Sequence, residues 1–120
     1  MSDTAEVVQL ERRADWRDWL ERNHETAVGV WLVTWKKPTG KPRVDYDGAV
    51  EEALCFGWVD SKSRSVDAER TSLYFTPRKP KSTWSESNVA RIEKLEAAGL
   101  LRAAGRRAVD EAKRGGAWPA

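Results

Sequence analysis

Seven tryptophans in a chain of 120 residues restrict the fold more than any other feature of the sequence. Each indole buries roughly 150–250 Å² in a core, and its N–H still needs a hydrogen-bond partner there. A domain of this length buries only about two-thirds of the surface that its unfolded chain exposes. We therefore expect at least four tryptophans in one core or at its edge and the rest along a groove; the seven are Trp16, Trp19, Trp31, Trp35, Trp58, Trp84 and Trp118.

Apolar residues at helical spacing predict four helices. The first carries Trp16, Trp19 and Leu20 on one face, and Asp45 and Ser85 are suitable N-caps for the second and third. The predicted helices cover residues 14–24, 46–56, 86–98 and 104–115.

β-branched and aromatic residues predict three strands. Residues 28–35 are apolar on both faces, which is typical of a central or well-covered strand. Residues 58–66 and 71–76 form the arms of a predicted hairpin, whereas two prolines and a glycine exclude regular structure from the basic loop 36–43. The predicted order is α-β-α-β-β-α-α. It indicates an α+β fold in which a small, mostly antiparallel sheet of about three strands is packed by about four helices.

The composition narrows the classes of protein that this chain fits. We expect residues 1–11 to be a flexible leader, with no signal peptide, and residues 12–120 to form a single domain. No apolar run approaches the roughly 20 residues needed to cross a membrane. With one cysteine and one histidine, we expect no disulfide, no metal site and no cofactor. The predicted location is the cytoplasm.

A basic loop followed by a helix start is the strongest candidate site. Arg78, Lys79 and Lys81 place three cations just before the helix that Ser85 caps. A helix start offers free N–H groups and about half a positive charge, which favours phosphate or carboxylate. In this interpretation Ser82 and Asn88 add neutral hydrogen bonds, and Trp84 adds a flat face for a ring. An ordinary solvated loop with a helix cap explains the same residues equally well.

The segment 53–60 is the predicted facing wall, through Trp58 and Asp60. An ion pair from Asp60 to Arg78 or Arg64 is its expected structural role. Cys55 lies between apolar neighbours, and a packed, inert thiol is expected there because free cysteine is among the most buried residue types.

These motifs carry a resemblance to the YdeI/OmpD-associated family, also called bacteriocin-protection or OmdA-like proteins. The resemblance covers nearly the whole chain, and its motifs are residues 30–32, Lys36-Lys37, Tyr46 with 51–60, 75–85 with Asn88, and 112–118. It implies a small bacterial protein, linked by the family's name to envelope stress or antimicrobial-peptide resistance. It implies no catalytic residues.

Three functions follow from these patterns. The leading hypothesis is a protein that binds a small anionic ligand, bearing phosphate or carboxylate, between the two walls. The second is a nucleic-acid-binding module using the basic loops; residues 61–120 carry 13 Lys/Arg against 7 Asp/Glu, but residues 1–60 carry 8 against 12. The third is an enzyme using Asp60 or Cys55, although no phosphate-binding glycine loop, zincin helix or serine-hydrolase elbow is present. A protein partner or a homo-oligomer stays open as well.

Overall fold

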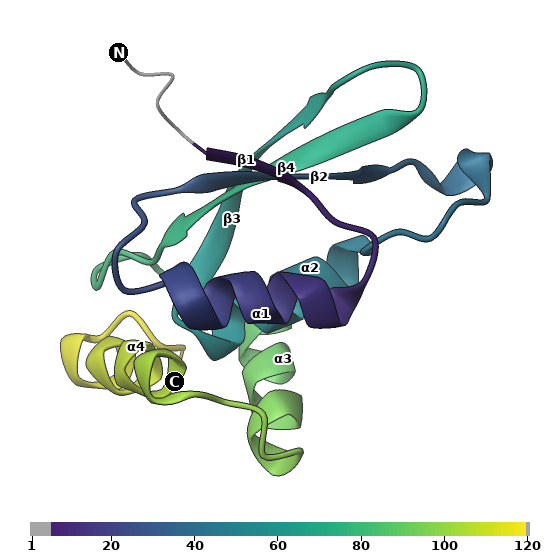
Figure 1. The fold of residues 1–120 in the computed structure, drawn as a ribbon. Helices are drawn as coiled ribbons and strands as arrows, with labels where there is room; N and C mark the ends of the chain where they lie inside the picture. Colours follow the sequence, from purple (N-terminus) through teal and green to yellow (C-terminus); the bar gives the residue numbers. More distant parts are fainter. Residues whose placement is uncertain (1–5, 120) are drawn as a thin grey trace.

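The computed structural model describes residues 6–119, which form an α+β fold (Figure 1). Helices α1 to α4 lie on one side of a four-stranded sheet. The predicted order of helices and strands is confirmed from residue 12 onward. The basic loop 36–43, which was expected to have no regular structure, contains one turn of 3-10 helix that includes its first proline. In chain order the elements are β1 (Glu6–Gln9), α1 (Arg13–Asn23), β2 (Val30–Trp35), the 3-10 helix η2 (Lys37–Thr39), α2 (Tyr46–Cys55), β3 (Trp58–Ser65), β4 (Arg70–Pro77), α3 (Glu86–Ala97) and α4 (Ala103–Gly115).

The sheet has the strand order β1-β2-β4-β3. β2 and β3 both pair antiparallel with β4, so the predicted hairpin is confirmed. β1 pairs parallel with β2, with Glu6 opposite Val30. The sheet is therefore mixed and has one strand more than predicted. Residues 6–9 of the predicted leader form this strand; the part of the leader before Glu6 lies outside the described residues.

The core lies between the sheet and the helices. Trp16, Trp19, Trp58 and Trp84 are all buried, which confirms that at least four tryptophans belong to the core. The Trp16 indole N–H donates to the carbonyl of Ala49 at 2.9 Å and so joins α1 to α2. Trp16 is therefore buried and its indole N–H still has a hydrogen-bond partner, as a tryptophan in a core requires.

The predicted helix caps are present. The Asp45 carboxylate accepts a hydrogen bond from the Gly48 N–H at 2.7 Å, and the Ser85 hydroxyl accepts one from the Asn88 N–H at 3.2 Å. Gly57 follows α2 with a φ of 77°, a conformation that glycine adopts without strain. Within residues 6–119, no helix combines the length and the apolar character needed to cross a membrane.

Candidate functional site

Arg78 is held in place by the loop that follows it. Its Nη2 donates to the carbonyls of Ser82 at 3.0 Å and Thr83 at 3.3 Å. Its guanidinium carbon lies 4.0 Å from the centre of the Trp84 ring. Burial lowers the pKa of Arg78, but an arginine side chain stays charged in proteins. The loop therefore fixes a cation with a defined orientation.

Trp84 packs against the guanidinium of Arg78 and is buried, so it is not an exposed wall of the site. Its side chain is 3% exposed, and its ring centre lies 5.1 Å from that of Trp118. The Trp84 N–H also donates to the carbonyl of Ala117 at 3.1 Å. The chain after α4 thus returns to the basic loop and packs against Trp84.

A hollow of about 720 Å³ adjoins the basic loop. We call it the basic hollow. Of the predicted site residues, Arg78, Lys79 and Ser82 line it. The remaining lining residues come from the segment before β2, from β3, from the end of β4 and from the basic loop: Ala27, Val28, Val59, Ser61, Thr76, Pro77 and Pro80.

Trp58 lies apart from this hollow. It is 1% exposed and packs edge-on against Trp19, with 5.8 Å between the ring centres. A second hollow of about 320 Å³ includes both Trp58 and Arg78 in its lining, together with His24 and Glu111. The two predicted walls therefore meet at Arg78, but Trp58 contributes to the core rather than to the basic hollow.

Asp60 does not contact the basic loop. Its carboxylate accepts a hydrogen bond from the Tyr46 hydroxyl at 3.0 Å, in place of the expected ion pair with Arg78 or Arg64. Asp60 shares a face of the sheet with Phe75, which belongs to the core, so it faces the helices. Burial and the Asp60 carboxylate raise the pKa of Tyr46.

Lys81 and Asn88 complete the predicted set. Lys81 is exposed and lines neither hollow. The Asn88 side-chain oxygen accepts a hydrogen bond from Arg91 at 3.1 Å, within the first two turns of α3. The structure thus brings Arg78, Lys79 and Ser82 together at the basic hollow, with Trp84 packed against Arg78. Trp58, Asp60, Lys81 and Asn88 do not line it.

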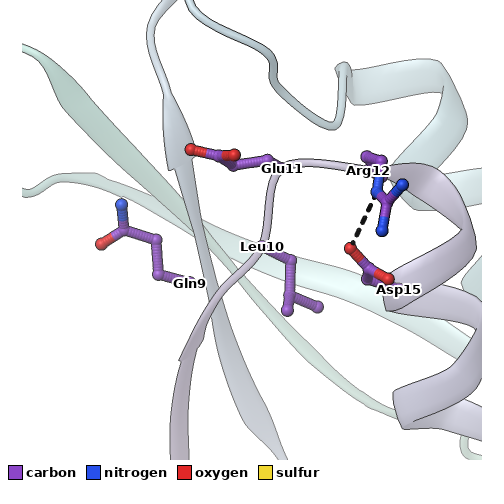
Figure 2. A pocket seen from close by; sticks show the side chains of 5 residues that line it. All are labelled: Gln9, Leu10, Glu11, Arg12 and Asp15. Atoms are coloured by element: carbon purple, nitrogen blue, oxygen red, sulfur yellow. Dashed lines mark hydrogen bonds and ion pairs between the residues drawn. The ribbon is translucent and has the colours of Figure 1, made fainter.

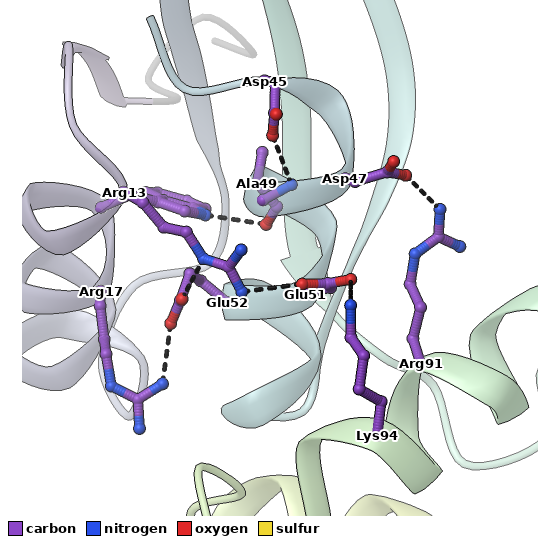
Figure 3. A network of polar contacts seen from close by, with 11 residues as sticks. Arg13, Arg17, Asp45, Asp47, Ala49, Glu51, Glu52, Arg91 and Lys94 are labelled. Atoms are coloured by element: carbon purple, nitrogen blue, oxygen red, sulfur yellow. Dashed lines mark hydrogen bonds and ion pairs between the residues drawn. The ribbon is translucent and has the colours of Figure 1, made fainter. Parts of the chain in front are cut away.

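The most extensive polar network lies in α2, outside the predicted site (Figure 3). Glu51 accepts from Arg13 at 2.8 Å and from Lys94 at 2.6 Å, while Glu52 accepts from Arg13 and, at 2.7 Å, from Arg17. Both carboxylates are only 5% exposed. Burial alone would raise the pKa of Glu51, but the hydrogen bonds from Lys94 and Arg13 lower it below its ordinary value. Each carboxylate has cationic partners, so the network joins α1, α2 and α3.

Cys55, at the end of α2, is fully buried. Burial raises the pKa of its thiol, so the thiol stays protonated at neutral pH. This environment agrees with the expected packing role.

A further hollow of about 440 Å³ lies where β1 leads into α1 (Figure 2). Arg12 and Asp15 face each other there at 3.3 Å, and Gln9 and Glu11 complete its polar lining. The ion pair is exposed and lies within one turn of α1, which is an ordinary helix-start contact. No group of acidic, histidine or cysteine side chains suited to a metal ion occurs in the described part of the chain.

The outward face of the sheet carries aromatic residues that the sequence did not single out as a site. Trp31 and Trp35 of β2 and Tyr74 of β4 are partly exposed and do not belong to the core cluster. Trp31 and Tyr74 are register partners, with ring centres 4.9 Å apart. The sequence gives no clear signal for this face, because β2 is apolar on both faces; the structure shows that Val30 and Leu32 point into the core.

Comparison with known proteins gives a family but no function. Residues 8–108 match the model of a family described as a domain of unknown function, DUF8412. No curated protein and no solved structure matches the chain. The resemblance to the YdeI/OmpD-associated family stays a prediction. Because the family model spans most of the 120 residues, the chain belongs to the DUF8412 family.

Proposed function

We propose that the protein binds a small anionic ligand, bearing phosphate or carboxylate, in the basic hollow. The proposal rests on the hydrogen bonding and the packing of Arg78. Its Nη2 is bonded to the loop and its plane rests on Trp84, while among residues 6–119 its Nε and Nη1 have no hydrogen-bond partner. An oriented guanidinium with free N–H groups on Nε and Nη1 can donate charge-assisted hydrogen bonds to an anion.

The charge balance of the hollow supports the same proposal. Arg78 and Lys79 are its charged lining residues, and no carboxylate lines it. Neither cation forms an ion pair with another of the described residues. An anion that enters the hollow therefore meets cations that have no internal partner.

The rest of the lining suggests a ligand with a less polar part. Ser61, Thr76 and Ser82 offer hydroxyl groups, whereas Val28 and Val59 offer apolar surface. Val28 is among the most exposed large apolar side chains of the protein, at 79%. Apolar lining with a few convergent polar groups is typical of small-molecule sites.

Calorimetric titration with inorganic phosphate, pyrophosphate, citrate and adenosine monophosphate tests the proposal. We expect at least one of these anions to bind, and Lys79→Gln to weaken its binding roughly tenfold because a charge-assisted contact is lost. Arg78→Lys keeps the charge but loses the planar fork, so it is expected to weaken binding as well.

Lys81→Gln is the matched control, since Lys81 lies in the same loop and lines neither hollow. This variant should bind like the unaltered protein. The proposal is wrong if none of the four anions binds, or if Lys79→Gln and Lys81→Gln bind equally well.

A further inference from the structure

One face of the sheet has no helix over it within residues 6–119 (Figure 1). Side chains alternate between the faces of a strand. Val30, Leu32 and Phe75 point toward the helices and belong to the core, so Trp31, Trp35 and Tyr74 point to the opposite face. These three aromatic residues and the cations beside them, Lys41, Lys62 and Arg64, are called the open-face cluster below.

The aromatic rings of this cluster are positioned by the strand register. Trp31 of β2 lies opposite Tyr74 of β4, and their planes are inclined by 38°. Gly29 lies under the end of the Tyr74 ring, where an added Cβ atom would lie 2.3 Å from the tyrosine hydroxyl oxygen. The glycine therefore allows the Tyr74 ring to lie across the start of β2.

Each aromatic ring has a cation close to its face. The guanidinium carbon of Arg64 lies 4.3 Å from the Trp31 ring centre, and the ammonium of Lys62 lies 5.3 Å from that of Tyr74. The ammonium of Lys41 lies 4.0 Å from the Trp35 ring centre. Cation–π contacts at exposed sites contribute only about 0.5–1 kcal/mol, so another partner can displace the cations.

The charge of this face is not neutralised internally. Lys41, Lys62 and Arg64 form no ion pair with any carboxylate of residues 6–119. Two nearby acidic groups are already hydrogen-bonded. Glu11 accepts from the Trp35 indole N–H at 2.9 Å, and Asp67 pairs with Arg70 at 2.9 Å.

Flat aromatic faces interleaved with unpaired cations match the chemistry of a nucleic-acid strand. Bases stack on aromatic rings or on guanidinium planes, and lysine and arginine contact the phosphates. Trp31 and Trp35 lie four residues apart on one strand, which separates them by about 13 Å. An open platform of this kind suits splayed bases, because the paired bases of a duplex are stacked on one another and cannot reach it.

We propose that the open-face cluster binds single-stranded nucleic acid, with bases on Trp31, Tyr74 and Trp35 and phosphates beside Lys62, Arg64 and Lys41. The inference does not depend on a ligand in the basic hollow, since the two sites share no residue.

Fluorescence anisotropy with labelled oligonucleotides about eight nucleotides long tests this proposal. The probes are oligo(U), oligo(A), oligo(dT) and a duplex of the same length. We expect the single strands to bind more tightly than the duplex, and comparison of RNA with DNA identifies the preferred sugar. Trp31→Leu and Trp35→Leu keep apolar cover but remove the stacking face, so each should weaken binding roughly tenfold.

The salt dependence of oligonucleotide binding distinguishes the contribution of base stacking from that of the charged contacts. Arg64→Gln should reduce the slope of log affinity against log salt by about 0.7 for one lost phosphate contact, whereas Trp31→Leu should leave the slope unchanged. Arg22→Gln, an equal change of charge on the exposed side of α1, is the control and should alter neither quantity. Thermal unfolding verifies that each variant is folded.

Three outcomes would overturn the proposal. One is no binding of any single strand at low salt. Another is equal binding by the unaltered protein and both tryptophan variants. The third is a dimer, detected by analytical ultracentrifugation, that Trp31→Leu dissociates, because the face would then join two copies of the chain. Lys79→Gln bears only on the basic hollow. Loss of anion binding in this variant, with unchanged oligonucleotide binding, leaves the proposal for the open-face cluster intact.

Discussion

Glu51 and Glu52 are buried carboxylates that join three helices through ion pairs. Their partners Arg13, Arg17 and Lys94 are themselves partly exposed, with side-chain exposures of 43%, 19% and 64%. The acids are thus desolvated more than their partners. Removal of one acid leaves its cations able to reach water, so the cost is smaller than for a fully buried pair.

Glu51→Gln should lower the free energy of unfolding by about 1.5–3 kcal/mol near neutral pH, because hydrogen bonds to a charged group are lost. The folded state lowers the pKa of Glu51, so its contribution is present above the ordinary carboxyl pKa. That contribution is lost as the pH falls through the folded-state pKa. Urea unfolding at about pH 7 and about pH 3 should therefore show a difference between variant and unaltered protein that shrinks in acid.

Glu93→Gln is the matched control for this substitution. Glu93 is exposed on α3, so its replacement should change stability by no more than about 0.5 kcal/mol. An equal effect of the two substitutions, or a Glu51 effect that does not depend on pH, would contradict the role given to the network.

The sequence did not indicate that two tryptophans of the candidate site are buried. Their positions beside charged segments suggested that Trp58 and Trp84 form walls, but both are buried. Local pattern does not say which side of a residue another element covers. Trp84 is covered by Trp118, which lies 34 residues further along the chain, and only the tertiary structure brings the two together.

At the scale of elements, α4 packs on the end of α2 through Gly105. A Cβ atom at this position would lie 2.4 Å from the carbonyl oxygen of Cys55 and 2.7 Å from that of Leu54. The Arg102 N–H donates to the same Cys55 carbonyl at 3.0 Å. The close approach of the two helices therefore requires a residue without a side chain.

Gly105→Ala should lower the free energy of unfolding by about 1–3 kcal/mol, since the added methyl group forces the helices apart. This loss should appear although alanine favours helix by about 1 kcal/mol over glycine. Gly115→Ala provides the comparison, because nothing lies within 4 Å of its added Cβ atom. Thermal unfolding should show a neutral or stabilising effect there; stabilisation by Gly105→Ala would contradict this packing.

Most elements could be predicted from periodicity and caps, but β1 and the environment of β2 could not. β1 has four residues, and α1 separates it from its parallel partner β2, so no hairpin pattern marks it. β2 is apolar on both faces, which predicted a central or well-covered strand, and the first alternative is confirmed. It is central in the sheet, but cations of the open-face cluster, rather than a helix, lie over its outward tryptophans.

At the scale of the whole molecule, the two sides of the sheet differ in what lies over them. The helix-covered side holds the core and the α2 network. The other side holds the open-face cluster. The basic hollow adjoins the same side, because Val59 and Thr76 are register partners whose side chains alternate with the core residues Trp58 and Phe75. Both proposed sites for anionic ligands thus belong to the side without helices.

Nuclear magnetic resonance of the tryptophan indole N–H groups shows whether the side of the sheet without helices binds the oligonucleotide. In a titration with the tightest-binding oligonucleotide, we expect the signals of Trp31 and Trp35 to shift, while those of the buried Trp16, Trp19 and Trp58 do not. Shifts confined to the buried tryptophans, or no shift at Trp31 and Trp35 while the oligonucleotide binds, would contradict the proposal for the open-face cluster.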